Sequence, residues 1–176
     1  EMLPDLMRYQ GTDHALKGEQ TLRAFLNRGG RTGFVGGSDT HEGTPAARTA
    51  VLAGDLTRAA VFDAFRHRRN YAVTHARIIL GFQINGHVMG EDIVVAGDPQ
   101  IVVDVKGTDR IEEVVIIRDG TTLHSVRPGA DSLHFTHVDR SFAGAGYYYV
   151  RVTQADKDEH GNPSQAWSSP IWVKRK

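Results

Sequence analysis

Asp39 and His41 are the residues in this sequence whose types and spacing best suit chemistry. They stand two residues apart in a glycine-rich stretch, Gly36–Pro45, which follows the short apolar run Gly33–Val35. An Asp oxygen and a His nitrogen are both ligands of divalent first-row metals, and glycines let a backbone turn tightly beside a ligand. The pattern predicts a strand that runs into a metal-binding loop. The alternative is an ordinary turn in which Asp39 caps backbone amides.

The composition excludes several classes of protein. The chain has 176 residues, enough for one ordinary domain or two small ones. Its 21 basic and 21 acidic residues cancel, so no basic surface for nucleic acid is expected. It has no cysteine, which excludes disulfides, thiolate metal ligands and a Cys nucleophile. No apolar run is long enough to span a membrane. Because the chain begins at Glu1 rather than Met, we expect a part of a longer protein, whose compartment stays open, export included.

Short helices and strands are expected to position the Asp39/His41 loop. The sequence predicts helices at 19–28, ending at Gly29-Gly30, and from a cap at Asp55 or Thr57 to Arg69, with strands at 33–35, 48–52 and 70–74. In α/β folds, functional residues gather in the loops that leave the strand ends. Residues 1–77 therefore predict an α/β unit, with the loop where a site would lie.

From residue 78 the hydrophobic period changes from helical to two. Apolar residues alternate between Ile78 and Ile84, and Asn85-Gly86 and Asp119-Gly120 are dipeptides typical of hairpin turns. About seven short strands without a convincing helix predict an antiparallel β-sandwich of immunoglobulin-like type over residues 78–176. The boundary between the two parts is expected near Arg77.

Several other side chains admit both a functional and a structural interpretation. Arg48, just after the loop, is a candidate for binding a substrate anion, and His75 is either an extra metal ligand or a packing histidine. The cluster His67-Arg68-Arg69 either binds phosphate or complements the dipole of the preceding helix. Aromatic residues form either the core of the sandwich or a platform for carbohydrate: Tyr147, Tyr148, Tyr149, Trp167 and Trp172.

Four runs of the sequence resemble the C-terminal part of a PHP-superfamily protein (polymerase and histidinol phosphatase), and within it the DUF3604 branch. They are GFVGGSDTHEGTP (33–45), LTRAAVFDAFRHRRNYAVT (56–74), YYYVRVTQ (147–154) and AWSSPIWV (166–173). The resemblance implies that residues 1–77 are the C-terminal segment of a distorted β/α barrel. Barrels of this superfamily bind up to three metals, usually zinc, manganese or iron, and many are phosphoesterases.

The resemblance also implies roles for individual residues. Asp39 and His41 fall on the last metal-binding motif of the superfamily, and Glu42 is expected to be a loop carboxylate. The other ligands of that site, an H-x-H pair and further His and Glu residues, have no counterpart before Asp39, where His14 is the only histidine. Two ligands fall short of a catalytic metal site, so this chain alone is not expected to be an active enzyme.

The sequence thus supports two hypotheses. In the first, the chain is the C-terminal fragment of a metal-dependent hydrolase that acts on a phosphate ester or another small molecule. In the second, it is a non-catalytic β-sandwich module for binding or interaction. A severed barrel leaves core side chains and sheet edges exposed, so the chain is also expected to form a homo-oligomer through the barrel remnant.

Overall fold

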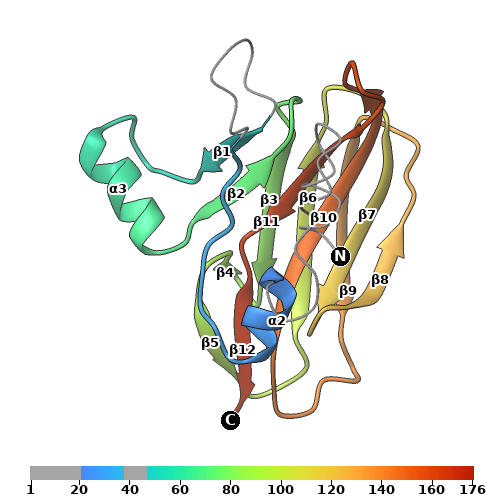
Figure 1. Ribbon diagram of the computed structural model, residues 1–176. Helices are drawn as coiled ribbons and strands as arrows, with labels where there is room; N and C mark the ends of the chain where they lie inside the picture. Colours follow the sequence, from blue (N-terminus) through green and yellow to red (C-terminus); the bar gives the residue numbers. More distant parts are fainter. Residues whose placement is uncertain (1–20, 38–46) are drawn as a thin grey trace.

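Two β-sheets make up most of the protein in the computed structural model, which describes residues 21–37 and 47–176 (Figure 1). The elements are α2 (Leu22–Asn27), β1 (Arg48–Val51), α3 (Arg58–Arg66), β2 (Asn70–Val73), β3 (Ile79–Ile84), β4 (His87–Val88), β5 (Asp92–Val95), β6 (Gln100–Lys106), β7 (Ile111–Arg118), β8 (Thr121–Val126), β9 (Ser132–Val138), β10 (Ala145–Lys157), β11 (Pro163–Ser168) and β12 (Ile171–Arg175). The larger sheet runs β1-β2-β11-β10-β12-β5, with β7 also on β10 and β8 on β7, and the smaller sheet runs β4-β3-β6-β9.

The two sheets form a sandwich because apolar side chains from both meet in one core. Phe82 and Val103 come from the smaller sheet, and Tyr148, Val150 and Ile171 come from the larger one. Along β3 the burial alternates, so that Leu80, Phe82 and Ile84 point inward while Ile79 is exposed. The period of two predicts this arrangement, because successive side chains of a strand point to opposite faces. The expectation of a β-sandwich is confirmed.

Both hairpin dipeptides lie in the turns that the sequence predicts. Asn85 and Gly86 have φ of 51° and 83°, and Asp119 and Gly120 have φ of 52° and 76°. Two successive left-handed residues are the mark of a type I′ turn, which matches the twist of the flanking strands. One pair of strands departs from the antiparallel expectation, since β5 lies parallel to β12 at the sheet edge, with Trp172 opposite Asp92. The chain reaches that edge from the other sheet, so a hairpin does not set its direction.

The first part of the described chain adds to the larger sheet. β1 and β2 are antiparallel, and β2 pairs with β11, where Ala72 lies opposite Trp167. This arrangement does not show a β/α barrel remnant, whose strands would be parallel. The expected barrel therefore stays a proposal, as does the division at Arg77, although strands on its two sides share a sheet.

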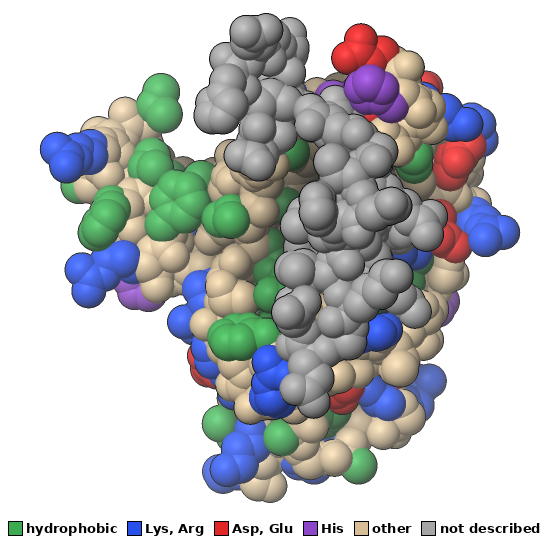
Figure 2. All heavy atoms as spheres, in the orientation of Figure 1, with side chains coloured by type: hydrophobic (Ala, Val, Ile, Leu, Met, Phe, Trp, Pro, Cys, Tyr) green, Lys and Arg blue, Asp and Glu red, His purple; other side chains and the backbone are tan. Residues whose placement is uncertain are grey.

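The helices agree with the sequence in place and in capping. Thr57 is the N-cap of α3, and its hydroxyl accepts a hydrogen bond from the Ala60 amide. α2 covers the outer face of the larger sheet, where Leu26 packs in a second apolar cluster with Phe34, Tyr149 and Trp167. α3 instead projects to one side of the body (Figures 1 and 2). Neither helix is long and apolar enough to cross a membrane.

Candidate functional site

Asp39, His41 and Glu42 lie outside the described residues, but the structure fixes the chain on both sides of them. The Gly36 amide donates to the Thr49 hydroxyl (3.0 Å), and that hydroxyl donates back to the Gly36 carbonyl (3.1 Å). A Cβ at Gly36 would lie 2.4 Å from the Arg48 carbonyl oxygen, a distance that only glycine tolerates. The described residues on the two sides of the candidate ligands therefore lie together, beside β1.

Phe34 attaches the residues just before Asp39 and His41 to the sandwich. Its amide donates to the Ser169 hydroxyl (2.8 Å), which in turn donates to the Asn70 carbonyl (2.5 Å). Its carbonyl accepts from the Asn70 side-chain amide (2.6 Å), and its ring meets Tyr149 edge to face at 5.4 Å. Residues 33–35 are not a strand, so the prediction of a strand there is wrong. The reason is that side chains, rather than the backbone of a neighbouring strand, supply the hydrogen-bond partners of Phe34.

Arg48 lies at the other end of the segment and is committed in part to the backbone. Its Nη1 donates to the His75 carbonyl (2.6 Å) in a partly buried setting. This bond ties the start of β1 to the residues that follow β2. The role of Arg48 in binding a substrate anion stays a prediction, since one side of its guanidinium is already occupied.

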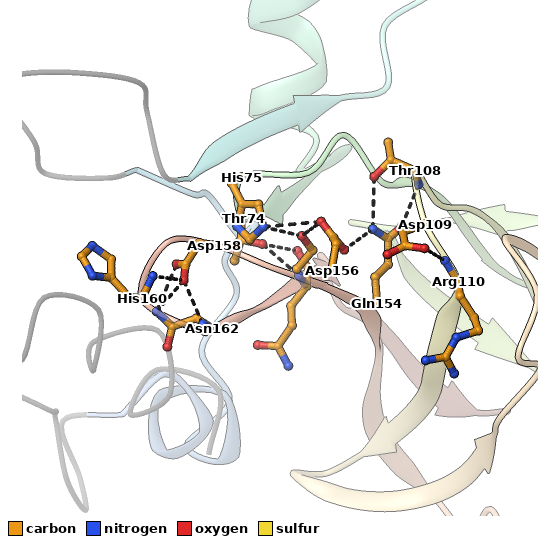
Figure 3. A network of polar contacts seen from close by, with 12 residues as sticks. Thr74, His75, Thr108, Asp109, Arg110, Gln154, Asp156, Asp158, His160 and Asn162 are labelled. Carbon is orange, nitrogen blue, oxygen red and sulfur yellow. Dashed lines mark hydrogen bonds and ion pairs between the residues drawn. The ribbon is translucent and has the colours of Figure 1, made fainter.

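His75 is part of a chain of polar contacts that runs into the sandwich (Figure 3). The hydroxyl of Ser164 donates to Asp156 Oδ2 (2.5 Å) and faces His75 Nε2 (2.7 Å). Because that hydroxyl gives its own proton to Asp156, it accepts from His75, whose Nε2 then carries the ring hydrogen. Gln154 continues the chain by donating to Asp156 Oδ1 (2.8 Å) and to the Thr108 hydroxyl (3.2 Å).

The contact between Ser164, His75 and Asp156 is not a nucleophilic triad. In a triad the histidine lies between the serine and the carboxylate and removes the serine proton. Here the serine lies in the middle, and it is fully buried. The arrangement supports the packing interpretation of His75. Sequence reasoning missed Asp156 and Ser164 because they lie on β10 and β11, some 80 to 90 positions after His75 by the residue numbers. The three residues therefore form no local motif.

Asp158 organises the turn that follows β10 in the same region. Its Oδ1 accepts hydrogen bonds from the amides of His160 (2.9 Å) and Asn162 (2.8 Å). Burial alone would raise the pKa of Asp158, but the hydrogen bonds from Asn162 and His160 outweigh it and hold the pKa below its ordinary value. The carboxylate is thus a structural cap for the turn.

The described residues do not assemble a metal centre of their own. Within 21–37 and 47–176, no three His, Asp or Glu side chains are grouped so that they could hold a metal ion. Histidines of the sandwich are engaged elsewhere: His134 pairs with Asp104, and His124 stacks on His137 with ring centroids 4.3 Å apart.

The aromatic and basic clusters are structural. The five aromatic residues considered as a carbohydrate platform are all buried, so the platform interpretation is wrong: Tyr147, Tyr148, Tyr149, Trp167 and Trp172. In the basic cluster, Arg68 binds the Gly90 carbonyl (2.8 Å) and Asp92 (3.0 Å), while Arg69 pairs with Asp63. These contacts favour the structural interpretation of the cluster over phosphate binding.

A groove of about 670 Å³ lies between α2, β5 and β12. Arg31 and Asp92 on its wall form an ion pair (2.7 Å), and the Arg31 guanidinium lies 4.9 Å from the ring centre of Trp172. Lys174 and Asp119 also line it. The groove thus offers charges of both signs beside the largely covered ring of Trp172.

Comparison with known proteins yields relatives of much greater length. No protein-family model matches the sequence. Proteins named only as uncharacterized, from Chlamydia muridarum and Chlamydia trachomatis serovar D, are each 33% identical over 186 residues. The match covers 88% of this chain and 29% of each relative. A Chlamydia pneumoniae protein is 34% identical over 143 residues, covering 71% of this chain and 22% of its own length.

One solved structure, described as fibronectin(III)-like modules of Clostridium thermocellum CbhA, matches 53% of this chain and 92% of its own. Its sequence identity is 16% and its TM-score is 0.28. The similarity to the chlamydial proteins is the more extensive finding, and this chain spans less than a third of their length.

Proposed function

We propose that this chain is the C-terminal part of a metal-dependent hydrolase of the PHP type, with Asp39 and His41 as two of its metal ligands. One observation carries the proposal. Described residues on the two sides of Asp39 and His41 lie together beside β1, where Gly36 and Arg48 are in contact and Thr49 holds Gly36 by two hydrogen bonds. Flanking residues that are held in this way favour the presentation of ligands in a fixed place, because pre-positioned ligands lose little freedom when a metal binds.

The resemblance of four sequence runs to the DUF3604 branch adds the chemistry. Zinc, manganese or iron bound by Asp39 and His41 would polarise a phosphate ester and lower the pKa of a bound water. The remaining ligands belong to the part of the longer protein outside this chain. The chlamydial relatives are long enough to contain such a part, since this chain matches 29% of their length. The chain by itself is therefore proposed to be inactive.

The experiment is made on the complete longer protein. Asp39→Asn and His41→Ala should each lower its metal content and its hydrolysis of a phosphate monoester by at least about a hundredfold, because each variant removes a side chain that would bind the metal directly. Glu42→Gln is the matched control and should leave both nearly unchanged. Full metal content and full hydrolysis in Asp39→Asn and His41→Ala would refute the proposal.

A non-catalytic binding module is the second candidate, and the groove beside α2 favours it. Its mixed charges suit a small zwitterionic or polar ligand rather than a stacked sugar, because Trp172 is buried and Arg31 lies over its ring. Arg31→Ala should abolish binding of any such ligand found in a screen of the intact chain. A ligand whose affinity does not change in this variant would exclude the groove.

A further inference from the structure

The α3 surface carries large apolar side chains that the described residues, 21–37 and 47–176, leave exposed. We define it by Leu52, Leu56, Phe62, Phe65 and Ile79, of which Leu56 is 99% exposed, Phe62 62%, Ile79 62%, Phe65 41% and Leu52 36%. Figure 2 shows hydrophobic side chains gathered over the projecting helix. Single exposed apolar residues are common on proteins, but a cluster of them marks an interaction surface.

α3 is held in place without burying these side chains. Ala64 is its one fully buried residue among positions 58–66, and β1 is its main neighbour. Local contacts support the helix instead, namely the Thr57 cap and the ion pair between Arg69 and Asp63. A helix of nine residues is too short to be stable by propensity alone, so it normally depends on packing of an apolar face. Phe62 and Phe65 lack that packing here.

The surface continues from the helix into a groove of about 500 Å³ at the start of the smaller sheet. Leu52 and Ile79 line this groove together with Leu133. On α3, Arg58 and Arg66 make no ion pair within the described part of the chain, whereas Asp63 pairs with Arg69. A complementary partner would present apolar side chains together with carboxylates for Arg58 and Arg66.

From these features we infer that the α3 surface is the docking face for the part of the longer polypeptide that lies outside this chain. The argument for that occupant is length, since the chlamydial relatives extend far beyond the region they share with this chain. A second copy is a poorer match, because packing α3 against its own symmetry mate would bring the unpaired Arg58 and Arg66 of both copies together. The inference rests on the proposed function in taking that outside part to be the remainder of the hydrolase.

Amide hydrogen exchange tests the inference on proteins as they exist. The full-length Chlamydia muridarum relative, at a concentration where light scattering shows a monomer, is compared with this chain. The amides of the helix equivalent to α3 should exchange at least roughly tenfold slower in the relative. The amides of β8, an edge strand of the larger sheet, should exchange at the same rate in both proteins. Equal exchange of the helix in the two proteins would overturn the inference.

A variant of this chain supplies the second arm. Phe62→Glu should leave the urea midpoint of the chain unchanged, because Phe62 is 62% exposed. Val94→Glu, at a residue of β5 that is 66% exposed, is the matched control and should likewise leave the urea midpoint unchanged. A lowered urea midpoint in Phe62→Glu would overturn the inference by showing that the helix packs on its own body.

The outcome is separable from that of the proposed function. The exchange comparison is made with excess chelator, so it needs neither metal nor hydrolysis. A protected helix in a relative that binds no metal would support the docking face and refute the proposed hydrolase. An unprotected helix in a relative that binds metal would refute the docking face and support the proposed hydrolase.

Discussion

Ser169 is the residue whose removal should most directly loosen the segment that leads to Asp39 and His41. Its buried hydroxyl accepts from the Phe34 amide and donates to the Asn70 carbonyl. Ser169→Ala removes both bonds and leaves two buried backbone groups without a partner. A lost hydrogen bond costs roughly 1 to 1.5 kcal/mol net, so the two together cost about 2 to 3 kcal/mol. At 1.4 kcal/mol per factor of ten, this corresponds to about 30- to 140-fold in an equilibrium.

The assay is hydrogen exchange of the Phe34 amide, followed by nuclear magnetic resonance. Under conditions where closing is faster than exchange, its rate reports the local opening equilibrium. The Phe34 amide should exchange about 30- to 140-fold faster in Ser169→Ala than in the unaltered chain.

Ser168→Ala is the matched control for this experiment. The neighbouring Ser168 is equally buried, but its hydroxyl accepts from the Val150 amide (2.9 Å) within the sandwich. This variant should speed exchange at Val150 and leave Phe34 unchanged. An unaltered Phe34 rate in Ser169→Ala, or an equal increase in Ser168→Ala, would refute the view that Ser169 anchors the segment.

Three further predictions concern stability. Asp139→Ala should lower the free energy of unfolding, measured in urea, by about 3 to 5 kcal/mol. It removes the carboxylate that lies 2.6 Å from Arg118 Nη1 and accepts a hydrogen bond (2.8 Å) from the buried Tyr148 hydroxyl, so both groups lose their partner. A loss below about 1 kcal/mol would contradict this. Burial, followed by the charge of His124, lowers the pKa of His137. As the pH falls, the unfolded state therefore binds the proton before the folded state does, and the stability should decline below about pH 6.5. His137→Phe should flatten this decline in thermal melts, and an unchanged slope would exclude His137 as its source. Gly36→Ala should cost about 1 to 3 kcal/mol because its Cβ meets the Arg48 carbonyl, whereas Gly37→Ala has open space and should cost less; equal urea midpoints for the two would rule out the close approach.

Local patterns predicted the sandwich well because its determinants are local. The alternation along β3 and the left-handed pairs Asn85-Gly86 and Asp119-Gly120 depend on neighbours in the sequence. The cap at Thr57 is equally local. Such features follow from backbone sterics and from the period of a strand, and a sequence displays both.

Pairings between distant segments could not be read in the same way. Nothing in the sequence near Ala72 specifies Trp167 as its partner, because strand register over such a separation depends on how the whole core packs. The parallel edge of β5 and β12 and the side-chain partners of Phe34 were missed for this reason. They determine how the first part of the described chain sits on the sandwich.

The candidate site divides along the same line. Residue type and spacing predict Asp39 and His41 as ligands from one stretch of ten residues, and this stays a prediction because both lie outside the described residues. The contacts of His75 with Ser164 and Asp156 join three separate strands' ends, so no spacing rule could predict them. Sequence patterns find ligands that are close in the chain, whereas the groups that orient a side chain are chosen by the fold.

The measurement that tests the central claim most directly is calorimetric titration of the purified chain with manganese or zinc, beside Asp39→Asn and Glu42→Gln. If Asp39 and His41 are ligands, the chain binds metal weakly through them, Asp39→Asn weakens binding by about tenfold or more, and Glu42→Gln binds like the unaltered chain. Equal binding of metal by all three proteins would contradict the assignment of Asp39 and His41 as metal ligands.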